Sequence, residues 1–292
     1  MIDGMQVSAA PVETELGEFF RRFRRNRSAV IGSSVVLLVL LVALLARHLA
    51  PYGYADTDLA LVWMDPDSEH LLGTDGLGRD ILSRILAGAS VSLGVAGSVL
   101  GLTLIFGTLL GMLAGYRGGW VDTVVMRGAD IISAFPELVF AIMLAAVLGP
   151  GVLTVILALA TVWWPGIARL ARSLVLALRQ EQFIEAAVVS GTRRRRILIR
   201  HLLPNILAPL LVRASIGVGF IITAEATLSF LGLGVQEPLP SWGGMIRDGL
   251  TVLRTDPTLA MATSAVLGLT IIGFNLLGDG LRDLLDPRIR DR

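Results

Sequence analysis

The sequence RRFRRNRSAVIGSSVVLLVLLVALLA, residues 21–46, places a cluster of arginines directly before an apolar run. No charged side chain interrupts the run from Ala29 to Ala46, and a helix needs roughly 20 predominantly apolar residues to cross a bilayer. Because arginines are retained on the cytoplasmic side of a membrane, this stretch predicts a cytoplasmic N-terminus followed by a membrane-spanning helix. The run is longer than the roughly 7–15 residues of a signal-peptide core, which disfavours a cleaved signal.

The rest of the chain has the same apolar character. Hydrophobic residues make up 54% of its 292 residues, charged residues make up 17%, and the mean hydropathy is +0.72, values typical of a membrane protein. Six apolar segments are long enough to span a bilayer, at residues 29–46, 91–116, 123–148, 151–170, 205–233 and 258–278. The sequence therefore predicts an all-α integral membrane protein with six transmembrane helices and both termini in the cytoplasm.

These spans divide the chain into five parts. We expect a cytoplasmic N-terminal segment at residues 1–28, a first span at 29–46 and an external segment at 47–90. A core domain of five spans follows at 91–280, with a cytoplasmic loop at about 181–204, and a cytoplasmic tail is expected at 281–292. In the external segment, the apolar positions of Leu77–Leu86 share one helical face, which predicts a separate interfacial helix. Trp242–Leu253 has a similar two-sided pattern and predicts a second external helix.

Several kinds of chemistry are excluded or disfavoured by composition. The chain has no cysteine, and its three histidines, His48, His70 and His201, show no metal-ligand spacing. All its basic residues are arginines, so the lysine of a Walker A loop is missing. If ATP drives this protein, another chain must bind it. No cluster of nucleophile and base suggests an intramembrane enzyme.

The cytoplasmic loop contains the most informative pattern. Apolar positions in Glu181–Ser190 predict a short helix, and Gly191 can adopt the positive φ that ends it. A second short helix is expected at Arg194–Leu203, and Pro204 fits the first turn of the following span. The result would be an elbow with Ala186 and Ala187 at its surface and Glu185 able to meet a basic partner. From the residues alone, this elbow either transmits motion or is a solvated loop whose arginines bind anionic lipid.

Polar residues within the spans suggest a transport pathway. Glu225 lies in the outer half of the fifth span, where a carboxylate is costly unless it faces protein or water. It is either part of the pathway or one half of a structural ion pair with Arg79 or Arg84 of the external segment. Thr223 and Thr227 add hydroxyl groups to the same span, which makes it the best candidate for lining the path.

Two further features concern the second and third spans. Asp130 follows Arg127 at a helical i,i+3 spacing, which favours local pairing, and Pro136 is expected to kink the third span, for gating or only for shape. In the second span, Gly107, Gly111 and Gly115, preceded by Gly97 and Gly101, predict close packing of helix backbones.

The cytoplasmic loop resembles the EAA loop of bacterial ABC importer permeases. Glu185, Ala186, Ala187, Gly191 and Leu203-Pro204 have the spacing of that motif, while His201 stands at its isoleucine position. Three other stretches are similar to motifs of the dipeptide, oligopeptide and nickel branch of the family: LGTDGLGRD at 72–80 with Ser83-Arg84, AEATLSFLGLG at 224–234 with Ser241-Trp242-Gly243, and NLLGDGLRD at 275–283 with Asp286-Pro287.

The resemblance implies the type I ABC importer permease fold and a C-type transmembrane subunit of the inner membrane. It implies a homologous second permease, two ATPases that bind ATP and Mg²⁺, and an external solute-binding protein, with no cofactor in this chain and no enzymatic activity of its own. Alternating access would move the solute, with Glu185, Ala186, Ala187 and Gly191 coupling it to the ATPases. Peptides are the expected solute, with nickel, glutathione or oligosaccharide as alternatives; membrane lipid is the only other expected partner, and nucleic acid is not one.

A rival class is an ion-coupled secondary carrier that acts alone. Such carriers usually have paired intramembrane carboxylates and inverted internal repeats. The sequence has one clear buried carboxylate, Glu225, and no visible repeat, so the importer subunit is the favoured interpretation.

Overall fold

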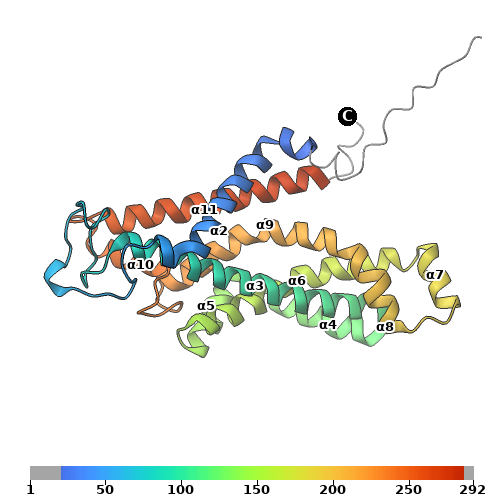
Figure 1. Cartoon of the computed structure of the whole chain (residues 1–292). Helices are drawn as coiled ribbons and strands as arrows, with labels where there is room; N and C mark the ends of the chain where they lie inside the picture. Colours follow the sequence, from blue (N-terminus) through green and yellow to red (C-terminus); the bar gives the residue numbers. More distant parts are fainter. Residues whose placement is uncertain (1–20, 286–292) are drawn as a thin grey trace, which may run out of the picture.

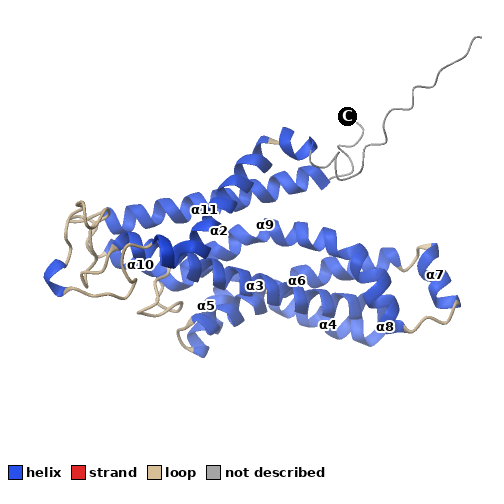
Figure 2. Cartoon of the chain, viewed as in Figure 1, coloured by secondary structure: helices blue, strands red, loops and turns tan. Residues whose placement is uncertain are grey.

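The computed structural model describes residues 21–285, in which every regular element is a helix and no strand occurs (Figure 2). Residues 21–25 are helical and precede Asn26, whose side chain caps the next helix. In chain order the elements are α2 (Arg27–Leu49), a short 3-10 helix (Leu59–Leu61), α3 (Ile81–Arg117), α4 (Gly119–Ser133), α5 (Glu137–Leu148), α6 (Val152–Leu178), α7 (Gln182–Val189), α8 (Arg194–Arg196), a π-helical segment (Ile197–Leu202), α9 (Leu203–Phe230), α10 (Trp242–Leu250) and α11 (Thr258–Leu285).

Five helical segments of the described chain are long and apolar enough to cross a membrane: α2, α3, α6, the continuous stretch Arg194–Phe230, and α11. A sixth span is formed if α4 and α5 are counted together, although the two helices meet at an angle of 91°. The all-helical architecture with up to six spans confirms the predicted all-α membrane fold, and the cytoplasmic location of the two termini stays a prediction.

The molecule is elongated, and its two ends differ (Figure 1). One end, which we call the α7 end, holds α7 and α8, and the other, the α10 end, holds α10 and the loops between α2 and α3. The start of α2 packs against the last turns of α11, where a Cβ added to Gly280 would lie 2.6 Å from Ala29 Cα. The beginning and the end of the helical bundle therefore lie side by side.

The core of the bundle is the contact between α3 and α6, the most extensive between any two described helices. Gly107, Gly111 and Gly115 form the contact surface of α3, and a Cβ added to Gly111 would lie 2.3 Å from the Ala168 carbonyl oxygen. The close packing predicted for these three glycines is confirmed. Gly97 and Gly101 have no neighbouring atoms within 4 Å of an added Cβ, so the prediction fails for them within this chain.

The prediction of a separate interfacial helix at Leu77–Leu86 is wrong. Asp80 caps the N-terminus of α3 by accepting a hydrogen bond from Ser83 N at 2.7 Å, and the helix then runs without a break to Arg117. Ile81 and Ile85 are buried against residues of α10 and α11, so their apolar face covers protein and not the membrane surface. The predicted boundary between residues 90 and 91 therefore falls inside a helix.

Other predicted ends need smaller corrections. α6 extends to Leu178 instead of residue 170, α10 ends at Leu250 instead of Leu253, and α11 continues to Leu285, into the segment expected to be a tail. α4 begins at Gly119, within a segment expected to be a loop. The predictions for residues 1–20 and 286–292 lie outside the described residues.

Candidate functional site

The predicted elbow is present at the α7 end. Its first helix, Gln182–Val189, is capped at Ser190 and followed by Gly191, which has a φ of +72°. The N–H of Gly191 donates to the Val188 carbonyl and that of Thr192 to the Ala187 carbonyl, each at 3.0 Å. This pair of bonds is a Schellman motif, which satisfies the last carbonyls of the helix and turns the chain. The expected helix and its glycine stop are confirmed.

The second half of the elbow differs from the prediction. The stretch Arg194–Leu203 is helical, as expected, but it is not a separate short helix, because the helical path continues without a break into α9. Residues Ile197–Leu202 are π-helical, and the N–H of Leu203 donates to the Leu198 carbonyl. Pro204 follows directly, and since it has no N–H and its ring crowds the carbonyl four residues earlier, a wide turn at this position accommodates it.

α7 is attached to the rest of the chain through one side. Ile184 is 2% exposed and Ala187 is partly buried, and both belong to a cluster with residues of α6 and α9. Glu185 and Ala186 are exposed, as are Val188 and Val189, the latter at 87%. Of the two alanines predicted at the surface, only Ala186 is there.

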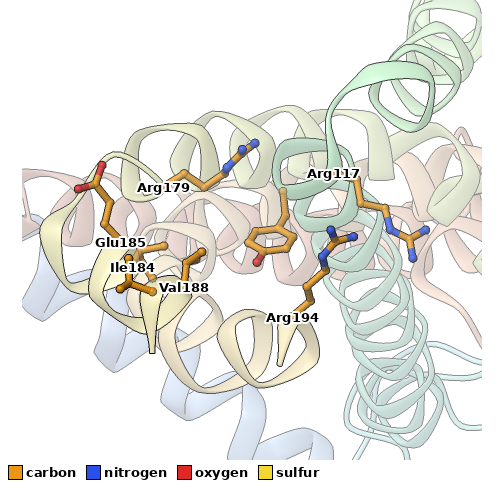
Figure 3. Close-up of a pocket in the computed structure, with 8 residues that line it drawn as sticks. Arg117, Arg179, Ile184, Glu185, Val188 and Arg194 are labelled. Carbon is orange, nitrogen blue, oxygen red and sulfur yellow. The ribbon is translucent and has the colours of Figure 1, made fainter. Parts of the chain in front are cut away.

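A hollow of about 600 Å³ lies beside α7. It is lined by α7 residues and by Tyr116, Arg117, Arg179 and Arg194. Arg179 donates to the Gly115 carbonyl at 3.0 Å and lies over the Tyr116 ring, while Glu185 extends away from the three guanidinium groups (Figure 3). The α7 end therefore offers a basic and apolar surface together with an exposed carboxylate.

The predicted pairing of Asp130 with Arg127 is wrong. Asp130 pairs instead with Arg169 of α6, at 3.1 Å. Arg172 of α6 forms two bonds to Asp122, at 2.5 and 2.6 Å. The i,i+3 spacing allowed a pair within α4, but α6 packs beside α4 and places its arginines within bonding distance of both carboxylates. Together these residues line a second hollow of about 510 Å³ between α4 and α6.

Pro136 lies where the third span breaks. The residue before a proline is disfavoured in the helical conformation, and the proline lacks the N–H needed to continue the hydrogen-bond ladder. α4 ends at Ser133 and α5 begins at Glu137, with an angle of 91° between them. The predicted position of the bend is confirmed, but the third span is broken into two helices at this point and is not a single kinked helix.

Glu225 and the two threonines of α9 face different surroundings. The Glu225 side chain is fully buried, accepts a bond from Ser229 Oγ at 2.8 Å, and has no ion pair in the described chain. Thr223 and Thr227 line a small hollow of about 170 Å³ with residues of α5 and α6, and each donates to the carbonyl four residues earlier. The suggested pairing of Glu225 with Arg79 or Arg84 is wrong.

Those two arginines belong to a network at the α10 end that sequence reasoning missed. Arg79 and Arg84 both contact Asp75, at 2.7 and 3.3 Å, and both contact Glu237, at 2.5 and 2.9 Å. Burial alone would lower the pKa of Arg79, but the hydrogen bond to Glu237 and the charge of Asp75 outweigh it and raise this pKa. The LGTDGLGRD motif contained Asp75 and Arg79, whereas nothing in the sequence indicated Glu237.

A second buried pair lies in the loop between α2 and α3. His70 Nδ1 lies 3.0 Å from Asp80 Oδ1, and the His70 ring stacks on Tyr52 at 4.6 Å between centroids. Asp80 also caps α3, so this pair fixes the loop to the helix. In residues 21–285 no group of three or more potential side-chain ligands could hold a metal ion.

Comparison with known proteins identifies relatives across most of the chain. A permease protein of a dipeptide transport system from Alkalihalophilus pseudofirmus is 41% identical over 94% of this chain and 90% of its own length. A glutathione transport system permease from Pectobacterium atrosepticum is 42% identical over 96% and 93%, and an oligopeptide transport system permease from Haemophilus influenzae is 39% identical over 92% and 88%.

Among solved structures, a chain of the MetNI methionine ABC transporter in inward-facing conformations has the same fold, with a TM-score of 0.53, 18% identity, and coverage of 70% of this chain and 97% of that one. Residues 14–66 match the N-terminal transmembrane domain of oligopeptide transport permease C. Residues 107–291 match the binding-protein-dependent transport system inner membrane component. With its apolar spans, this chain is a multi-pass protein of the cell inner membrane and belongs to the family of binding-protein-dependent transport system inner membrane components.

Proposed function

We propose that this chain is a permease subunit of an ATP-driven importer that carries di- or oligopeptides across the cytoplasmic membrane. In this proposal the α7 end is cytoplasmic, as the arginines at the start of α2 and around α8 favour. Two ATPases and a homologous second permease complete the transporter, and an external binding protein delivers the solute to the α10 end. The chain itself has no enzymatic activity.

The observation that carries the proposal is the surface of α7. A short helix outside the apolar spans exposes Val188, Val189 and Phe183 next to Glu185. Exposed apolar side chains grouped on one element mark an interaction surface. Because Ile184 and Ala187 fix the opposite side of α7 to α6 and α9, a partner that moves α7 also moves two spans. The arrangement suits an ATPase that drives alternating access.

ATP and Mg²⁺ would be bound by the ATPases. The chain lacks lysine altogether, so it lacks the residue with which a Walker A loop reaches the nucleotide phosphates. Glu185, Ala186 and Gly191 would form the docking surface and its turn, with Ala187 and Pro204 supporting them from within. This arrangement also separates the proposal from a single-chain carrier, which needs no docking surface.

The pathway would run along α9 and the break between α4 and α5. Thr223 and Thr227 line a hollow there, and the 91° break after Ser133 supplies an irregular segment at membrane depth, which bilayers tolerate where it faces protein or water. Pro136 would act as the gating position. Asp130, held by Arg169, would lie toward the cytoplasmic side of the same path, and Glu225 would serve as a buried structural residue.

Glutathione is the second candidate solute. A relative named as a glutathione transport permease is as similar to this chain as the dipeptide relative, and glutathione is itself a small peptide. Both candidates share a free amino group and carboxylates, so a peptide-like solute is the common element of the proposal. Nickel and oligosaccharides remain the alternatives from the sequence.

The proposal is tested by purifying the C-terminally tagged chain from its native membrane in mild detergent and identifying its companions by mass spectrometry. We expect two ATPase chains and a second permease. A Gly191→Pro variant should lose the ATPases and retain the second permease, because proline cannot adopt the φ of +72° found at residue 191.

The matched control is Gly268→Ala, which changes a helical glycine of α11 with open space around it and should retain every companion. If the unmodified chain purifies without an ATPase, the importer proposal is wrong and a single-chain carrier takes its place. If Gly191→Pro retains the ATPases, they do not dock through α7.

A further inference from the structure

The break in the third span exposes a carboxylate that the proposed coupling mechanism does not use. Glu137 is the first residue of α5 and its side chain is exposed. Among residues 21–285, no hydrogen bond or ion pair involves the Glu137 carboxylate, whereas Asp122 and Asp130 of the adjoining α4 are both paired with arginines of α6. Within the described chain, Glu137 is therefore an unpaired carboxylate in the third span, whose other two carboxylates are both paired with arginines.

The surroundings of Glu137 lie at membrane depth. Its hollow is shared with Leu159 and Trp163 of α6 and with Thr223 and Thr227 of α9. Trp163 lies eleven residues after Val152, the first residue of α6, or about 17 Å along the helix. Thr223 lies seven residues before Phe230, the last residue of α9, or about 10 Å. A carboxylate at this depth is costly unless water or a cation faces it.

The walls of the hollow match a cation and not an anion. Trp163 and Phe220 contribute aromatic rings with centroids 6.3 Å apart, and ring faces attract ammonium groups. The hydroxyls of Thr223 and Thr227 donate to carbonyls of their own helix, so their lone pairs stay available as acceptors. No arginine or histidine is among the described residues that line it.

The size of the hollow limits what it can hold. Its volume is about 170 Å³, below the roughly 300–1,000 Å³ of sites that enclose a whole small ligand. It fits a terminal group of a solute rather than the entire molecule. An ammonium group has three donors and no acceptor, which complements a carboxylate and two hydroxyl oxygens.

We propose that Glu137, Thr223 and Thr227, with the rings of Trp163 and Phe220, form a subsite for the primary ammonium group of the solute in transit. This inference rests on the proposed import function for the identity of the solute. It makes the permease selective for solutes with a free amino group, after the binding protein has delivered them. The competing explanation is that Glu137 only stabilises the N-terminus of α5 through the helix dipole.

The absence of cysteine from the chain permits a direct test. In the assembled transporter in nanodiscs, Thr227→Cys is modified by two methanethiosulfonate reagents, one carrying a trimethylammonium group and one a sulfonate. We expect the ratio of the cationic to the anionic rate to be about tenfold higher with Glu137 than with Glu137→Gln, since a carboxylate in a confined site concentrates cations. At Thr251→Cys, on an exposed residue beyond α10, Glu137→Gln should leave the ratio unchanged.

A second measurement links the subsite to transport. Uptake of L-alanyl-L-alanine is measured in proteoliposomes that contain the complete transporter and its binding protein. Glu137→Gln should lower the rate about tenfold, because a hydrogen bond to a charged group is lost, and Glu137→Asp should recover part of it. ATP hydrolysis stimulated by the binding protein should persist in both variants.

The outcomes separate the two proposals. No uptake by the unmodified transporter would contradict the import function, while the labelling ratio would still decide whether Glu137 creates a cation site. Normal uptake by Glu137→Gln, or an unchanged labelling ratio at Thr227→Cys, would overturn the subsite. A variant that only melts at a lower temperature, with both readouts unchanged, would establish the helix-dipole explanation instead.

Discussion

The two ends of the molecule satisfy their charges in different ways. At the α10 end, the arginines and carboxylates of Asp75, Arg79, Arg84 and Glu237 pair with one another, and three of these four residues are buried. At the α7 end, Glu185 and the arginines 193–196 are exposed and form no ion pair within the described chain. One end is complete within the chain, and the other presents charges that the chain itself does not use.

Apolar side chains show the same contrast. Trp242 at the α10 end is fully buried, and its indole N–H donates to the Ile85 carbonyl at 3.1 Å. At the α7 end, Val189 is almost fully exposed, and Ile184 is the only fully buried side chain of α7. A membrane subunit can therefore hold one end rigid by internal pairing while leaving the other end to be completed by partners.

The largest expected effect concerns the α10 end. Arg84→Ala should lower the free energy of unfolding by about 3–5 kcal/mol, because Arg84 and Asp75 are buried and the substitution removes one of the two cations that pair with the Asp75 carboxylate. The change is measured by denaturant unfolding in mixed micelles, followed by circular dichroism. Arg247→Ala is the control, since Arg247 forms a half-exposed pair with Asp248 at 3.0 Å and should cost at most about 1 kcal/mol. Equal losses in the two variants would remove the contrast between a buried network and a surface pair.

An intermediate effect is expected at the α7 end. Ile184→Ala should lower the free energy for local opening of α7 by about 2–3 kcal/mol, since it empties the main apolar anchor of that helix. Hydrogen exchange of the amides of residues 184–192 measures this opening, and exchange in α3 should be unchanged. Val189→Ala, at an exposed position of the same helix, should leave exchange unaltered in the isolated chain. If Ile184→Ala destabilised the whole bundle instead, α7 would be part of the core and not an attached docking element.

The smallest effect is expected at Glu225. Glu225→Gln keeps the acceptor that Ser229 Oγ uses and removes no ion pair, so the free energy of unfolding should change by less than about 1 kcal/mol. The same unfolding measurement as for Arg84→Ala applies. A loss close to that of Arg84→Ala would mean that the Glu225 carboxylate makes an interaction within the chain that glutamine cannot replace, and the contrast between Glu225 and the paired arginines would be lost.

Features that depend on local sequence were predictable. The apolar runs fixed the spans, Gly191 fixed the end of α7, and Pro136 fixed the break in the third span, because each depends on backbone geometry within a few residues. The elbow residues Glu185, Ala186 and Gly191 were found for the same reason. Ala187 was misplaced because its exposure depends on which side of α7 meets α6 and α9.

Features that depend on distant neighbours were not predictable. Asp130 pairs with Arg169 across two helices, although Arg127 stood at a favourable local spacing. Glu237 and Arg84 are separated by 153 positions in the chain, and Glu237 lies in a loop without periodicity. The start of α3 was assigned to an interfacial helix because its apolar face fits a membrane surface as well as it fits α10 and α11. In each case the packing partner decided the outcome.

The length of α3 has a thermodynamic consequence. Its 37 residues extend over about 55 Å, from the capped loop at Asp80 to Tyr116 and Arg117 beside α7. One uninterrupted helix thus reaches both the surface proposed to receive the binding protein and the surface proposed to receive an ATPase. If docking at one end shifts α3 between two positions, the binding free energies at the two ends are linked. The factor by which a bound ATPase raises the affinity of the permease for the binding protein must then equal the factor by which the binding protein raises its affinity for the ATPase.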